Sequence, residues 1–210
     1  HMPEHMVLKP VFLGGKLRFF VANIAHVGEI GGMAPGSFAA DATEVYQEGL
    51  RLPPIKIMRR GDYVKDVWKI ILSNHRTPKS SWGDLHAMIG SLSIAEDRLL
   101  KLMERYGADV LARAAIQLLD YSDRWMRAEI REIPNGVYEA TDCMEDDGIS
   151  NQPVWMRLKL IVADDEIIAD WTASDPQARG PINATFVVTV AATYSAVLHV
   201  TNKDIPRNSG

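Results

Sequence analysis

HMPEHMVLKPVFLGGKLRFFVANIAHVGEIGG, residues 1–32, forms the N-terminal segment on which the structural prediction rests. Two apolar runs, 7–13 and 17–24, flank the turn sequence Gly14-Gly15-Lys16. A Gly-Gly junction between two strand-type runs is typical of a β-hairpin. Because a hairpin returns the chain to its start, the pattern predicts that the residues before the first run lie near those after the second.

Each end of this hairpin carries a histidine followed three residues later by a glutamate. The two pairs are His1 with Glu4 and His26 with Glu29. Imidazole and carboxylate groups are ligands of borderline divalent ions such as zinc, manganese and iron. The same spacing also arises by chance in surface histidines with acidic neighbours. The residues alone therefore leave a metal site and two solvated surface pairs open as alternatives.

Composition narrows the class of protein. The chain has 210 residues and a formal net charge of −4, with no block of basic residues, which argues against binding of nucleic-acid phosphates. The single cysteine, Cys143, excludes an internal disulfide framework and suits a reducing compartment. No apolar run is long enough for a membrane span and no signal peptide is visible, so a cytoplasmic location is the default expectation.

Periodicity predicts an α+β fold. The N-terminal hairpin is followed by a Gly-rich loop over 28–40, a short helix over 42–48 and a strand over 55–58. A helix opens at Gly61-Asp62, and two longer helices follow. The first of these is capped by Ser80 or Ser81, and the second begins at Asp109. Because their connection at Tyr106-Gly107 is short, we expect these two helices to pack antiparallel.

The last part of the chain changes to strand periodicity. Antiparallel strands are predicted over 137–141, 154–162 and 166–172. Periodicity does not distinguish a strand from a buried helix over 185–200, but the length of this apolar stretch favours a buried helix. The acidic cluster Glu145-Asp146-Asp147 precedes Gly148, which favours a solvated hairpin turn over a calcium loop. The chain contains no GxSxG nucleophile motif and no GxxxxGK[ST] phosphate loop. A metal site is therefore the best chemistry that the residues themselves offer.

Several short motifs, in a fixed order along nearly the whole chain, resemble the hydantoinase B/oxoprolinase family. They are ANIAH (22–26), GGMAPGS (31–37), EGLRLPPIK (48–56), GDL (83–85), LDYS (119–122), IPNGVY (133–138), SDPQ (174–177) and GPIN (180–183). The opening His1-Met2-Pro3-Glu4 is similar to a His-Leu-Pro-Asp motif of the family, so His1 is interpreted as native. Members are much longer, and the resemblance implies that 1–210 is an internal fragment of a B-type catalytic domain, divided into 1–60, 61–134 and 135–210.

The resemblance implies a B-type subunit of an ATP-dependent amidohydrolase that opens a cyclic amide: a hydantoin, 5-oxoproline or a lactam. A hydantoinase A-type partner would bind ATP and phosphorylate the substrate, so a hetero-oligomer is expected and the fragment alone would be inactive. The alternatives are the metal-containing subunit of an acetone- or acetophenone-type ketone carboxylase and a non-catalytic assembly segment. The sequence of residues 31–37 resembles the hydantoinase branch more than the carboxylase branch, so hydrolysis is ranked first.

The resemblance also assigns the metal ligands. The family's metal-binding positions correspond to His1, Glu4 and His26, and its next acidic position corresponds to Glu29. Both acidic positions are glutamate here where aspartate is usual, which leaves the metal open among zinc, manganese and iron. Such an ion would polarise a carbonyl or lower the pKa of a bound water.

Overall fold

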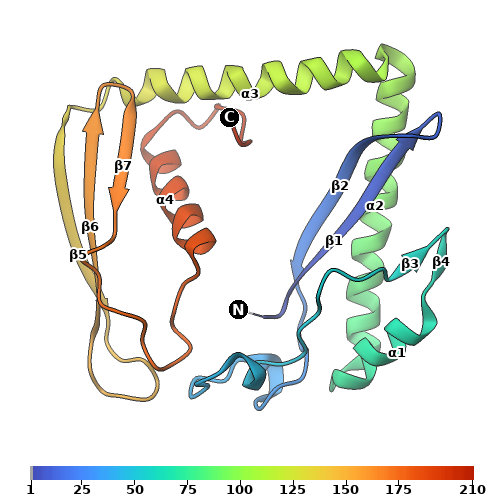
Figure 1. Cartoon of the computed structure of the whole chain (residues 1–210), viewed down its shortest axis with the longest axis horizontal. Coiled ribbons are helices and arrows are strands. Elements are labelled where there is room, and N and C mark those ends of the chain that lie inside the picture. Colours follow the sequence, from blue (N-terminus) through green and yellow to red (C-terminus); the bar gives the residue numbers. More distant parts are fainter. Residues whose placement is uncertain (1) are drawn as a thin grey trace. The chain divides into compact units, whose positions relative to one another are not determined.

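The computed structural model describes residues 2–210, and the chain divides into one unit up to Ala108 and a second unit, Asp109–Gly210 (Figure 1). Both units combine helices with small antiparallel sheets, which confirms the predicted α+β class. The boundary between the units falls inside the region 61–134 that the sequence predicts as one helical block. Gly107 ends the preceding helix there with φ of 88°, a conformation that glycine adopts without strain. No helix among the described residues is long and apolar enough to cross a membrane.

The N-terminal hairpin is confirmed. Strand β1 (Glu4–Leu13) pairs antiparallel with β2 (Lys16–His26), and the connecting Gly14 and Gly15 have φ of 60° and 74°. Both values are positive, as a two-residue hairpin turn requires. The register places Glu4 directly opposite His26. The long strands thus bring Glu4 and His26, one member of each predicted pair, to the same end of the ladder.

One face of the hairpin packs against helix α2 (Pro78–Tyr106). Val11 is completely buried there, and Asn23 donates a hydrogen bond from Nδ2 to the carbonyl of Met88 at 2.9 Å. At the rim, Lys9 forms an ion pair with Glu96 at 2.5 Å. These contacts fix the hairpin on a rigid helix, which holds its open end in a defined place.

The segment before α2 differs from the prediction. The expected strand over 55–58 is a two-residue β3 (Met58–Arg59) paired with β4 (Asp62–Tyr63), and helix α1 (Lys65–Asn74) starts only afterwards. Arg60 and Gly61 take positive φ of 54° and 91°, so Gly61 forms a hairpin turn and does not begin a helix. In the core of this unit, Trp68 and Ile71 of α1 pack with Leu85 and Met88 of α2.

Two other helix starts also differ. The predicted helix over 42–48 is a single 3₁₀ turn, η2 (Val45–Gln47), and the Gly-rich loop carries a second one, η1 (Pro35–Ser37). Helix α2 begins at Pro78 and not after a Ser80 or Ser81 cap. Proline suits the first helical turn because that position needs no N–H donor. Ser81 is buried inside the first turn, where its hydroxyl donates to the carbonyl of Thr77 at 3.2 Å.

The second unit contains α3 (Ala108–Ile130), a sheet in the order β5 (Gly136–Met144), β6 (Val154–Ala163) and β7 (Glu166–Asp170), and α4 (Phe186–Val200). The three strands and the last helix confirm the sequence prediction. The expected burial of the last helix is not met within this chain, since none of its residues is buried and Phe186 is 82% exposed. The antiparallel packing of α2 and α3 concerns the arrangement of the two units and stays a prediction.

In the acidic turn of the second unit, Glu145 and Asp146 are exposed as expected, whereas Asp147 is not. Asp147 is only 3% exposed, and its carboxylate accepts N–H donors from Ile149 and Ser150 at 3.0 and 2.6 Å. It also accepts the N–H groups of Arg179 and Gly180, at 3.1 and 3.3 Å, which ties two loops together. These donors, led by those of Ser150 and Ile149, hold the pKa of Asp147 far below its usual range. The sequence missed this role because half of the donors lie more than thirty residues away.

Candidate functional site

The open end of the hairpin places two of the predicted metal ligands on neighbouring strands. Glu4 and His26 occupy opposite register positions, and the next ladder bond runs from the N–H of Val27 to the carbonyl of Pro3 at 3.0 Å. The His26 ring stacks on Phe38 of the Gly-rich loop, with ring centroids 5.7 Å apart. His1, the third predicted ligand, lies outside the described residues.

Glu29, the fourth predicted ligand, is bound to other protein groups. It is 4% exposed, and its carboxylate accepts the backbone N–H groups of Gly31 and Arg76. The Arg76 guanidinium adds an ion pair at 3.1 Å. Burial raises the pKa of Glu29, but the N–H groups of Arg76 and Gly31 and the guanidinium lower it by more, so the group is ionised.

Glu29 therefore joins the Gly-rich loop to the end of α1. Arg76 extends this connection, because its Nη2 donates to the carbonyl of Gly32 at 2.6 Å and its Nη1 to that of Ala34 at 3.3 Å. Among residues 2–210, no group of three or more His, Cys, Asp or Glu side chains is placed to hold a metal ion. The site of His1, Glu4, His26 and Glu29 stays a prediction, since one of its members is not described.

A half-buried histidine, His5, and a buried one, His75, lie beside this network. His5 of β1 and His75, just after α1, have ring centroids 6.2 Å apart. His75 is 5% exposed, and neither of its ring nitrogens has a hydrogen-bond partner among the described residues. Burial lowers the pKa of both rings; His75 lowers that of His5 further, whereas Glu29 partly opposes the shift of His75. The inward position of His5 in an alternating strand was the one available signal of its burial.

His86 of α2 belongs to an aromatic cluster. Its Nε2 lies 2.6 Å from the hydroxyl of Tyr63, and its ring contacts Trp82 with centroids 4.1 Å apart. Tyr63 in turn packs edge-on against Trp68 of the core. This placement gives His86 a structural role in the first unit.

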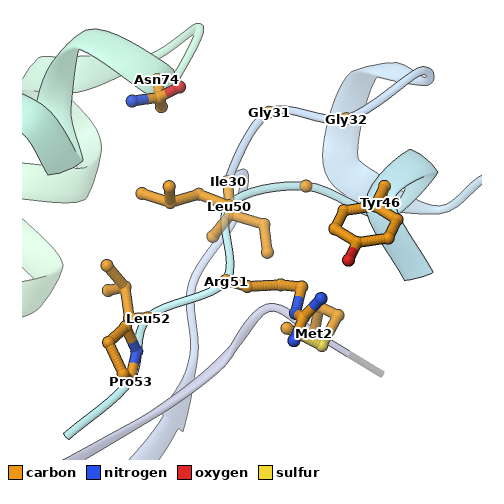
Figure 2. A pocket seen from close by; sticks show the side chains of 11 residues that line it. Met2, Ile30, Gly31, Gly32, Tyr46, Leu50, Arg51, Leu52, Pro53 and Asn74 are labelled. Atoms are coloured by element: carbon orange, nitrogen blue, oxygen red, sulfur yellow. The ribbon is translucent and has the colours of Figure 1, made fainter.

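A cavity of about 700 Å³ opens beside the hairpin end (Figure 2). The Gly-rich loop, the segment 46–53 and the end of α1 form its walls, and Met2 reaches it from the N-terminal side. The lining is mainly apolar, with one charged side chain, that of Arg51. The lining residues are Met2, Ile30, Gly31, Gly32, Tyr46, Gly49, Leu50, Arg51, Leu52, Pro53 and Asn74.

Glycine is required in this wall because main chains approach each other closely. A Cβ on Gly31 would lie 2.7 Å from the carbonyl oxygen of Asn74, and one on Gly32 would lie 2.6 Å from that of Gln47. Both residues also have φ near +90°. The Gly-rich loop is then joined to its neighbour by hydrogen bonds from Met33 N to the Gln47 carbonyl and from Leu50 N to the Ile30 carbonyl, at 2.8 and 2.9 Å. These glycines build the cavity wall, which explains their number without a phosphate loop.

The comparisons agree with this architecture. The family model for hydantoinase B/oxoprolinase matches residues 1–210. An uncharacterized protein of Methanocaldococcus jannaschii is 38% identical over 210 residues, which are 100% of this chain and 37% of that protein. Caprolactamase subunit beta of Pseudomonas jessenii is 33% identical over 210 residues, 100% of this chain and 36% of that protein.

The solved structures agree as well. The crystal structure of ATP-dependent caprolactamase from Pseudomonas jessenii superimposes with a TM-score of 0.86 at 32% identity, covering 94% of this chain and 34% of that one. The chain thus spans about a third of the length of the two relatives described above. The family model matches residues 1–210, and the fold is shared with a solved structure at 32% identity. The chain therefore belongs to the hydantoinase B/oxoprolinase family.

Proposed function

We propose that this chain is part of the B-type catalytic subunit of an ATP-dependent amidohydrolase that opens a cyclic amide. A partner of the hydantoinase A type would bind ATP and phosphorylate the amide oxygen, and the B-type subunit would direct water to the activated carbon. The observation that carries the proposal is the similarity to caprolactamase subunit beta, at 33% identity over the whole chain. A lactam is accordingly the first substrate class to test.

The hairpin end supplies residues that suit this chemistry. Glu4 and His26 lie on paired strands and, with His1, form the proposed set of metal ligands. Neutral imidazole and carboxylate match zinc, manganese or iron, and such an ion would supply Lewis-acid activation of water or of a carbonyl. Glu29 is proposed to support this site by holding the Gly-rich loop against Arg76, because its oxygens are already hydrogen-bonded.

The cavity beside the hairpin end is the proposed substrate pocket. Its apolar walls exclude water from one side of a ring amide, and its 700 Å³ suits a small cyclic substrate. The Phe38 ring, stacked on His26, limits solvent access to that imidazole from the loop side. Cytoplasmic location and a hetero-oligomeric assembly belong to the same proposal.

The test is reconstitution of the full-length protein with its A-type partner. We expect ATP hydrolysis that depends on an added lactam, hydantoin or 5-oxoproline, with one ring opened per ATP consumed, and loss of ring opening in a His26→Ala variant. ATP hydrolysis that instead requires a ketone and bicarbonate would assign the carboxylase function. A complex that binds but turns over neither class would support a purely structural segment.

A further inference from the structure

The cavity carries one positive charge for which residues 2–210 supply no ion pair. Arg51 is the one charged side chain in its lining. It is an exposed residue, so water solvates part of its guanidinium, and no ion pair joins it to another of the described residues. A guanidinium facing an apolar cavity is stabilised when an oxyanion fills its hydrogen-bond donors. The unmatched charge therefore indicates the sign of a ligand group.

The Arg51 side chain contacts an aromatic ring. Its guanidinium carbon lies 5.1 Å from the centroid of Tyr46, within the range of a cation–π contact. Figure 2 shows the Tyr46 ring above the Arg51 side chain, with the Tyr46 hydroxyl pointing down toward Arg51. A stacked guanidinium loses less freedom on binding an anion, and its free edge remains available for two hydrogen bonds.

The rest of the cavity is apolar, and it adjoins the hairpin end. Ile30, Leu50, Leu52 and Pro53 supply surface for a short hydrocarbon body. Met2 lines the same cavity, two residues before Glu4, whose strand neighbour is His26. A ligand seated here would have its anionic group at Arg51 while its body reaches the proposed metal-binding end.

We propose that the cavity lined by Arg51 and Tyr46 binds the oxyanion of a small aliphatic substrate or product, through the Arg51 guanidinium. The shared chemistry is an oxyanion on a short aliphatic body, which is smaller than the drug-sized ligands that cavities of 700 Å³ commonly hold. Two sources supply it: the phosphoryl group of an activated cyclic amide and the carboxylate of a ring-opened product. This inference rests on the proposed function for the identity of the reaction.

The test is direct binding, without ATP or partner, to the whole chain. Pentylphosphonate and hexanoate represent the two oxyanions, and hexanamide is the neutral control of the same length. The titration is monitored by calorimetry and by the NMR amide signals of Gly31 and Gly32, which line the cavity. We expect both anions to bind more tightly than hexanamide and to shift those two signals.

Matched variants locate the binding group. Arg51→Gln should weaken binding of both anions by about tenfold or more, the loss typical of one charge-assisted hydrogen-bonded pair, and leave hexanamide unchanged. Arg51→Lys keeps the charge and should retain most of the affinity. Arg98→Gln removes an equal charge from an exposed position of α2 and should change nothing. Circular dichroism and unfolding midpoints confirm that each variant is folded.

The ranking of the two anions assigns the source. Tighter binding of the phosphonate identifies the activated substrate, and tighter binding of hexanoate identifies the product. Equal affinity of the wild type and Arg51→Gln for the anions, or equal affinity of the wild type for hexanamide, would overturn the anion site. Lactam-dependent turnover by the complex together with such a result would leave the proposed function standing, whereas anion binding at Arg51 without any turnover would overturn the function and not the site.

Discussion

Glu29 offers the sharpest perturbation of the candidate site. Its side chain is 5% exposed and accepts hydrogen bonds from Gly31 and from both the backbone and the guanidinium of Arg76. Glu29→Gln keeps the shape and one oxygen but replaces the other by an amide that cannot accept the same donors. A hydrogen bond to a charged group contributes about 1.5–3 kcal/mol.

The expected cost must be reduced for solvent screening. Arg76 is 43% exposed, so part of its charge is compensated by water once the partner is lost. We therefore expect Glu29→Gln to lower the free energy of unfolding by about 1–3 kcal/mol and Glu29→Ala by about 3 kcal/mol. Urea unfolding of the chain at neutral pH measures both. An exposed glutamate in the same unit, Glu104, supplies the control: Glu104→Gln should stay within about 0.5 kcal/mol of the wild type.

The stability that Glu29 contributes should depend on pH in a definite direction. The folded pKa of Glu29 lies below its ordinary value of 4.5, so its stabilising effect is fully present above pH 4.5 and is lost as the pH falls through the lower, folded pKa. The gap in stability between the wild type and Glu29→Gln should therefore narrow in acid. A loss below about 0.5 kcal/mol at neutral pH, or a gap that does not change with pH, would refute the role given to this carboxylate.

Gly180→Ala should destabilise the second unit by more than about 2 kcal/mol, because its Cβ would lie 1.5 Å from the carbonyl oxygen of Asp147. Gly28→Ala, whose Cβ would have nothing within 4 Å, should cost little, and unfolding measurements compare the two variants. Gly32→Ala should abolish anion binding in the cavity while secondary structure persists, because its Cβ would lie 2.6 Å from the Gln47 carbonyl; the calorimetric titration measures the loss. The imidazole of His75 should titrate below 6.5 in an NMR pH series, and because its folded pKa is lowered, the stability that it contributes is present above pH 6.5 and falls in acid; a pKa above 6.5 would contradict its buried, neutral state.

Local patterns predict the hairpin and the C-terminal strands because their determinants lie within a few residues. Gly14 and Gly15 fix the turn, and the alternating runs on each side fix the pairing that sets Glu4 opposite His26. The same reasoning fails where a residue with positive φ looks like a helix start. Gly61 is such a case, because the adjacent Arg60 shares its left-handed conformation and forms a turn between β3 and β4.

The candidate site is less accessible to sequence reasoning because its contacts are distant in the chain. Glu29 meets Arg76 across 47 residues, and no local spacing distinguishes this ion pair from a metal ligand. Asp147 likewise meets Gly180 across 33 residues. Arg51 looks like an ordinary exposed cation until the fold of residues 30–53 builds a cavity around it.

The metal at the hairpin end is the central claim of the proposed function, and elemental analysis tests it most directly. The full-length protein is dialysed against mixed zinc, manganese and iron, alongside His26→Ala and the control His199→Ala, whose imidazole lies on an exposed face of α4. We predict about one equivalent of a single metal in the wild type and in His199→Ala, and its loss in His26→Ala. Absence of retained metal from the wild type, or equal retention in all three proteins, would contradict the assignment of His26 as a ligand.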